Sequence, residues 1–175
     1  MPTPSASDIK PATTLELCAE FGPYARRLPP LIDYTAAKHF VGPASILKVS
    51  AGREKLNAAL LNSCAEHVVI IDARHLDPLA VVGPVEVASA ISGKCRALLV
   101  FGAVYDVGKL AKERAMPVYA LDNSPRVLEA QRGRVEATFI DCEAGLITND
   151  FYITGDADAI VAVLRPQMQE HFPVP

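Results

Sequence analysis

The fold is decided by the central segment His67–Leu121, which reads HVVIIDARHLDPLAVVGPVEVASAISGKCRALLVFGAVYDVGKLAKERAMPVYAL. It holds three short apolar runs, which is the pattern of strands buried on both faces of a sheet. The two stretches between these runs have helical spacing, and the first begins with a proline at the favoured first-turn position. This alternation predicts a parallel βαβαβ core with right-handed crossovers. The predicted strands are His67–Asp72, Ala97–Phe101 and Pro117–Leu121, and the predicted helices are Pro84–Ser92 and Val107–Ala115.

The flanking segments extend this core on both sides. Upstream, the apolar pattern predicts a helix interrupted at Gly22-Pro23, then a strand and a second helix, over Thr14–Arg27, Phe40–Val49 and Arg53–Glu66. Downstream, short strands separated by Gly or Asp predict a β-rich second layer, over Val135–Asp141, Leu146-Ile147, Phe151–Thr154 and Ile160–Leu164. We therefore expect a single α/β domain over residues 14–175, preceded by a proline-rich, flexible leader at residues 1–13.

Composition limits the classes of function. The chain has 175 residues, half of them hydrophobic and 21% charged, which suits one globular domain and excludes a disordered chain. The net charge is −3, with 17 basic against 20 acidic residues and no basic cluster, so direct binding to nucleic acid is not expected. No apolar run approaches the roughly 20 residues of a membrane span, so no membrane contact is expected either.

The cysteines point to a reducing compartment. Cys18, Cys64, Cys95 and Cys142 are far apart in sequence and form no Cys-x-x-Cys pair. This usage is typical of reduced thiols rather than of a disulfide framework or a structural zinc site. We therefore predict a cytoplasmic protein in which the default state of Cys95 and Cys142 is a buried, inert thiol.

Three carboxylates follow the predicted parallel strands. Asp72, Asp106 and Asp122 fall at the carboxyl ends of these strands, where ligands bind in α/β sheets. Oxygen-rich clusters of this kind suit Mg²⁺. The alternative is that strand-end aspartates cap helices and shape turns, and Asp106 in particular stands where it could cap the next helix. The sequence leaves both interpretations open.

Five motifs, in order and spacing, resemble the RraA-like family. They are Phe40-Val-Gly-Pro-Ala-Ser-Ile-Leu47, Val68-Val-Ile-Ile-Asp72, Ala80-Val-Val-Gly83, Val100-Phe-Gly-Ala-Val-Tyr-Asp106 and Met116-Pro-Val-Tyr119. The similarity extends over about Leu15–Pro166. The family includes the regulator of ribonuclease E activity and the class II pyruvate aldolases that cleave 4-hydroxy-4-methyl-2-oxoglutarate. The resemblance implies a compact, swivelling-domain-like α/β/β sandwich that assembles into homotrimers or homohexamers.

The resemblance also implies a site. In the aldolases, the aspartate of a Gly-x-x-Arg-Asp turn holds a divalent cation, and backbone amides after an Ala-x-x-Gly loop hold the pyruvate part. Asp106 matches the metal ligand, for Mg²⁺ or Mn²⁺, and Gly102 matches the glycine of the turn. Gly83 matches the loop glycine, so the substrate-binding positions implied are Gly83, Val85, Glu86 and Gly102.

The sequence departs from the family pattern around this site. The arginine of the turn is Tyr105, and Pro84 removes a backbone N–H just after Gly83. Tyrosine cannot supply the charge-assisted contact that an arginine makes to a carboxylate. The loop after the first core strand carries Arg74, which could bring a positive charge back to the pocket. The candidate catalytic residues are therefore Tyr105 and Arg74.

Two classes of function follow. The departures predict a degenerate pyruvate aldolase site without the family's aldolase activity. If it is active, the chain is a divalent-metal-dependent C–C lyase or decarboxylase on a small 2-oxo acid. The alternative is a non-catalytic regulator that binds a protein partner, or a binder of another small metabolite, since a fold never guarantees an activity.

Overall fold

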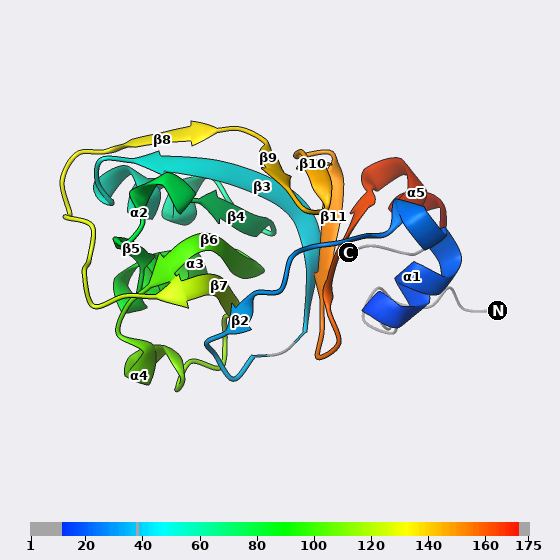
Figure 1. Ribbon diagram of the computed structural model, residues 1–175, viewed down its shortest axis with the longest axis horizontal. Coiled ribbons are helices and arrows are strands. Elements are labelled where there is room, and N and C mark those ends of the chain that lie inside the picture. The colour runs from blue at the N-terminus through cyan, green and yellow to red at the C-terminus, as the bar shows by residue number, and fades with distance from the viewer. Residues whose placement is uncertain (1–11, 38, 172–175) are drawn as a thin grey trace.

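The computed structural model describes residues 12–37 and 39–171 (Figure 1). The predicted leader therefore lies outside the described residues except for Ala12 and Thr13. Thr13 caps the first helix, α1 (Thr14–Phe21), by accepting a hydrogen bond from the Glu16 N–H. None of the helices in the described ranges combines the length and apolar character that a bilayer span requires.

The predicted parallel core is confirmed. Strands β3 (Phe40–Ser50), β4 (Val68–Asp72), β6 (Ala97–Val104) and β7 (Val118–Asn123) lie side by side in that order and run parallel. Helices α2 (Glu54–Asn62) and α3 (Pro84–Ser92) connect them and pack on one face. Their apolar residues, such as Leu56, Leu60 and Val87, are buried against β4 and β6. The α/β fold class is thus the one expected from the alternation of strands and helices.

The expected β-rich second layer is also present. The strands after the core are β8 (Arg134–Ala137), β9 (Ile140–Cys142), β10 (Gly145–Ile147), β11 (Phe151–Gly155) and β12 (Ile160–Leu164). Strand β3 joins the two layers, because its first residues pair with β11 and its later ones with β4. Figure 1 shows β3 arching from the α2 side of the molecule to β11. A second core, which includes Ile70, Leu99 and Ile153, fills the space between the layers.

Short elements complete the molecule. Strand β1 (Arg26–Arg27) extends the sheet beside β12, and β2 (Ile32–Asp33) extends it beside β7. The 3-10 turns η1 (Gly22–Tyr24) and η2 (Arg74–Leu76) follow α1 and β4. Helix α5 (Arg165–His171) closes the described chain and lies near α1 beyond β11 (Figure 1).

The clearest differences from the predicted elements are at three places. The first helix ends at Phe21, since Gly22 has φ +52°. The helix expected over Val107–Ala115 is one turn, α4 (Val107–Leu110). After Leu110 the chain continues in turns, in which the Lys112 and Glu113 N–H groups bond to carbonyl oxygens three residues back. The Glu113 carboxylate then accepts hydrogen bonds from the N–H groups of residues 114 and 115. The short strand β5 (Ala80–Val82) was not expected and pairs in parallel with β6.

Candidate functional site

A fully buried carboxylate lies at the start of α3. Glu86 is in the first turn of this helix and has no exposed surface. Its Oε2 accepts a hydrogen bond from the Gly83 N–H at 2.9 Å, and its Oε1 accepts one from Arg53 Nη1 at 2.7 Å. The Asn57 side-chain amide donates a third at 3.0 Å. A buried carboxylate needs such partners, because an unpaired charge in the interior is costly.

Tyr105 joins the same cluster from the end of β6. Its hydroxyl donates to Glu86 Oε2 at 2.8 Å and accepts from Arg53 Nη1 at 2.8 Å. The Arg53 guanidinium carbon also lies 5.2 Å from the centre of the Tyr105 ring, within cation–π range. We call Arg53, Asn57, Glu86 and Tyr105 the Glu86 network. It joins α2, α3 and the end of β6.

The Tyr105 ring lies directly against Gly83. A Cβ atom at Gly83 would come within 2.3–2.5 Å of three ring atoms, so only glycine fits beneath the ring. The Gly83 N–H is already bonded to Glu86, and Pro84 has no N–H to offer. The backbone after the loop therefore offers neither space nor a free donor at these two positions.

The Glu86 network is close to electrically neutral. The Arg53 side chain is 13% exposed and its guanidinium is paired with the Glu86 carboxylate. Burial, together with the hydrogen bond to Glu86, raises the pKa of Tyr105 to about 12. The phenol is therefore protonated at neutral pH, and the positive charge next to it is compensated by a carboxylate.

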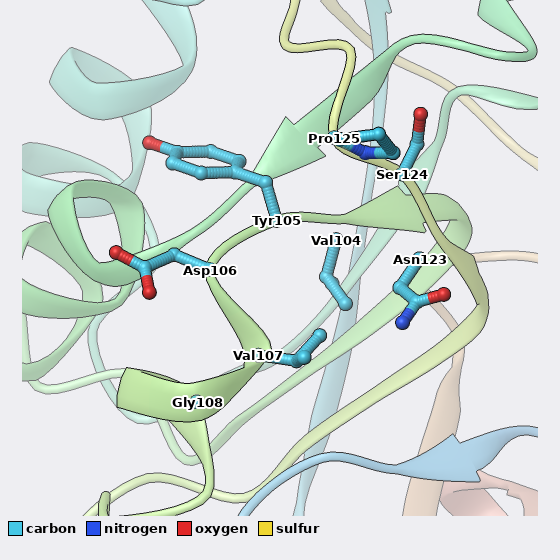
Figure 2. A pocket seen from close by; sticks show the side chains of 8 residues that line it. All are labelled: Val104, Tyr105, Asp106, Val107, Gly108, Asn123, Ser124 and Pro125. Atoms are coloured by element: carbon cyan, nitrogen blue, oxygen red, sulfur yellow. The ribbon is translucent and has the colours of Figure 1, made fainter.

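On the other side of the turn, a cavity of about 380 Å³ opens between the ends of β6 and β7. It is lined by Val104, Tyr105, Asp106, Val107, Gly108, Asn123, Ser124 and Pro125. Figure 2 shows the Tyr105 ring directed away from Asn123 and Ser124. Asp106 has φ +54° and precedes α4, but its side chain does not cap that helix. Its carboxylate pairs instead with Lys109 Nζ at 2.7 Å, and both side chains are exposed.

These residues fit a divalent cation poorly. Asp106 is the acidic side chain among the cavity-lining residues, and Lys109 already balances its charge. Asn123 and Ser124 add only neutral oxygens. Within residues 12–37 and 39–171, no group of three or more His, Cys, Asp and Glu side chains could hold a metal ion. Asp106 as a metal ligand therefore stays a prediction.

Arg74 is engaged elsewhere. Its Nε and Nη2 each donate to the Asp72 carboxylate at 2.9 Å, and its Nη1 donates to the Asp141 carbonyl oxygen at 2.8 Å. Burial raises the pKa of Asp72, but the hydrogen bonds and charge of Arg74 outweigh burial and lower it. None of the described hydrogen bonds or ion pairs joins Arg74 to Tyr105 or Asp106.

The structure thus brings only part of the predicted site together. Gly83, Glu86 and Tyr105 meet in one cluster. Val85, although next to them in sequence, is 60% exposed. Gly102 faces the Ala73 methyl group, where a Cβ would lie at 3.0 Å.

Sequence reasoning missed Arg53 and Asn57. They lie at the start and in the first half of α2, about 30 residues before their partner Glu86. No motif links the two helices. The one available signal was the Arg-Glu-Lys-Leu-Asn run at 53–57, which looks like any solvated helix start.

Comparison with known proteins gives a family and a fold. The family model RraA-like, described as Aldolase/RraA, matches residues 11–162. No curated protein matches the sequence. Three similar solved structures come from Geobacillus kaustophilus, Thermus thermophilus and Streptomyces coelicolor, at 18%, 20% and 19% identity and with TM-scores of 0.78, 0.74 and 0.70. They cover 88%, 88% and 97% of this chain, which in turn covers 96%, 93% and 90% of theirs.

These three proteins are named for different functions. The first is an S-adenosylmethionine:2-dimethylmenaquinone methyltransferase, the second the RNA-processing inhibitor RraA, and the third RraAS2, an unusual member of the RNase ES inhibitor RraA family. At identities of 18–20% the likeness establishes the fold alone. The function must be argued from the site itself.

Proposed function

This chain belongs to the RraA-like family, and we propose that it acts there as a protein-binding regulator without pyruvate aldolase activity. The observation that carries the loss of aldolase activity is the Glu86 network, in which Tyr105 covers Gly83 and the Glu86 carboxylate is paired with Arg53. Cytoplasmic localisation and assembly into trimers or hexamers remain predictions.

The Glu86 network lacks the unpaired positive charge that aldolase chemistry requires. Retro-aldol cleavage and 2-oxo acid decarboxylation both build negative charge on an enolate oxygen, which needs a preorganised positive charge. Tyr105 stands at the position of the turn's arginine, and the guanidinium next to it, that of Arg53, is paired with Glu86. A substrate carboxylate would have to displace the buried Glu86 carboxylate, which would then lose its main partner.

The surface that we propose for a protein partner is the hairpin of β9 and β10 together with the residue before β9. Ile140 and Ile147 pair across the hairpin and are fully buried, so alternation places their neighbours on the opposite face. On that outer side Phe139 is 57% and Leu146 47% exposed. Exposed apolar side chains that lie together mark many protein interfaces, and these two are our candidate contacts. We propose an RNase E-type endoribonuclease as the partner, by analogy with the two RraA structures.

The first test measures pyruvate release by the full chain. Oxaloacetate and 4-hydroxy-4-methyl-2-oxoglutarate are each supplied with Mg²⁺, with Mn²⁺ and after chelation, beside an aldolase that retains the Gly-x-x-Arg-Asp turn. We expect rates equal to the protein-free blank under all conditions. Metal-dependent release above the blank would refute the loss of activity and support a lyase.

The second test measures RNA cleavage. The chain is added in excess to an RNase E-type endoribonuclease with a model RNA. We expect a saturable decrease in the initial cleavage rate that F139D and L146D weaken. L61D is the matched control, because Leu61 is 48% exposed on α2, away from the hairpin. Unchanged cleavage at excess protein would exclude this partner and leave a small metabolite as the remaining candidate.

A further inference from the structure

Two buried cysteines lie next to each other behind the sheet. Cys64 follows the end of α2 and is 1% exposed, and Cys95 precedes β6 and is 8% exposed. Both belong to the same core cluster. The Cys95 Sγ lies 3.5 Å from the carbonyl oxygen of Leu60, one helical turn before Cys64. Their side chains therefore meet at the C-terminal end of α2.

The backbone fixes this proximity. The Glu66 N–H donates to the Lys94 carbonyl oxygen at 2.8 Å, and the Arg96 N–H donates to the His67 carbonyl oxygen at 2.8 Å. These two bonds hold the segment after α2 alongside the segment before β6. Both sulfurs thereby face the same part of the core, at the C-terminal end of α2. A disulfide requires neighbouring Cα positions and converging side chains, and the two backbone bonds between these loop segments hold both cysteines close together.

We propose that Cys64 and Cys95 are a dithiol pair that closes to an intramolecular disulfide when the chain meets a low-molecular-weight disulfide. In the first step, which requires local opening at the C-terminal end of α2 because both sulfurs are buried, the Cys64 thiolate attacks one sulfur of the oxidant, forms a mixed disulfide and releases one thiolate. In the second step Cys95 gives up its proton and attacks the Cys64 sulfur, which releases the second thiol. The two protein thiols are oxidised, and one small disulfide is reduced to two thiols.

The environments of the two sulfurs assign their roles. The hydrogen bond from Cys95 lowers the pKa of Cys64 to about 7 against the effect of burial, with a smaller contribution from the Ser45 hydroxyl, 3.9 Å from its Sγ. The hydrogen bond with Cys64, and burial, raise the pKa of Cys95. The Leu60 carbonyl oxygen beside the Cys95 sulfur favours its protonated thiol, whereas the Ser45 hydroxyl beside the Cys64 sulfur can donate to a thiolate, so Cys64 is the attacking sulfur and Cys95 the resolving one.

The other two cysteines are placed differently. Cys18 is exposed on α1, and Cys142 is half-buried in β9, where its thiol lies 3.7 Å from the Gly145 carbonyl oxygen. Cys18 can take up a small thiol from solvent and would obscure a simple thiol count. The C18S/C142S double variant removes this complication and leaves only the proposed pair.

The test incubates reduced C18S/C142S protein with glutathione disulfide and then titrates free thiols after unfolding in denaturant. We expect loss of both remaining thiols, and a peptide map that shows Cys64 joined to Cys95 with no glutathione attached. The cross-link closes a loop of about 30 residues, so we expect the oxidised form to unfold roughly 5–10 °C higher than the reduced form.

Further variants make the result specific. The same cross-linked Cys64–Cys95 peptide should appear in wild-type protein, which would show that the C18S and C142S substitutions do not cause the cross-link. In the triple variant C18S/C95A/C142S the remaining Cys64 should end as a mixed disulfide with glutathione, since no second protein thiol resolves it. Two free thiols after oxidation, or glutathione adducts on both cysteines of C18S/C142S, would overturn the proposal.

Discussion

The two consecutive residues at the end of β6 have opposite environments. Tyr105 turns into the interior, where its hydroxyl bonds to Glu86 and Arg53. Asp106 turns to solvent, where its carboxylate pairs with the exposed Lys109. In the family's aldolases an arginine stands beside the metal-binding aspartate of the turn. In this chain the guanidinium bonded to Tyr105, that of Arg53, lies on the inward side and is neutralised there by Glu86, so Asp106 has only the exposed Lys109 ammonium as its partner among the described ion pairs.

The largest effect is expected from Glu86→Gln. The change removes the negative charge that balances Arg53 and leaves a guanidinium with little exposure unpaired. Loss of one partner from a buried ion pair costs about 3 kcal/mol or more in the free energy of unfolding. Urea denaturation measures it. Glu54→Gln makes the same chemical change on an exposed residue and should stay within about 0.5 kcal/mol of wild type. Equal stability of the two variants would contradict the network.

Gly83→Ala tests the contact beneath the ring. The new methyl group would overlap the Tyr105 ring, so we expect a loss of about 1–3 kcal/mol. Adding Tyr105→Ala to this variant should relieve the clash, giving a double-mutant cycle with a clear coupling energy. Gly108→Ala is the matched control, because a Cβ there meets nothing within 4 Å. Additive effects of the two substitutions would show that ring and glycine do not touch.

Tyr105→Phe removes only the hydroxyl. We expect a loss of about 1 kcal/mol near neutral pH, the usual value of a hydrogen-bonded group. The pH dependence is more specific. An unfolded tyrosine ionises near pH 10, whereas burial and Glu86 raise the pKa of Tyr105 to about 12. Between these values the folded state binds more protons than the unfolded state, so its stability falls as pH rises.

Tyr105→Phe should reduce this loss of folding stability at alkaline pH. Part of the loss of stability should remain in the variant, because burial also raises the pKa of Tyr119 to about 12. Tyr24→Phe, on a residue 64% exposed, should leave the profile of wild type unchanged. Stability curves from pH 8 to pH 12 that coincide for Tyr105→Phe and wild type would place the Tyr105 hydroxyl outside the network.

The smallest effect is expected from Asp106→Asn. Its ion pair with Lys109 is solvent-exposed, and such pairs contribute under about 1 kcal/mol. We expect a change within about 0.5 kcal/mol by urea denaturation. A loss comparable to that of Glu86→Gln would mean that the outward side of the turn is as tightly organised as the inward side.

The layers of the fold could be predicted from the sequence, but the side-chain contacts within the site could not. The parallel strands were predictable because their apolar runs are short, buried and regularly spaced. Strand β5 was not, since its three residues carry too little pattern and become a strand only by pairing with β6. The positions of Gly83, Glu86 and Tyr105 came from the family resemblance.

The partner of Glu86 could not be read from the chain. Arg53 reaches Glu86 across two helices, and tertiary packing alone determines which cations meet a buried carboxylate. The same holds for Arg74, a candidate from the sequence for a positive charge in the pocket, which the structure pairs with Asp72. Local patterns predict elements well and long-range side-chain pairs poorly, because a pair leaves no periodic signal.

The most direct measurement of the central claim is a calorimetric titration of wild-type protein with oxalate, a stable mimic of the pyruvate enolate, in the presence of Mn²⁺. Because Tyr105 covers Gly83 and Glu86 occupies Arg53, we predict no saturable heat of binding. Saturable, Mn²⁺-dependent binding of oxalate that Asp106→Asn abolishes would contradict the account.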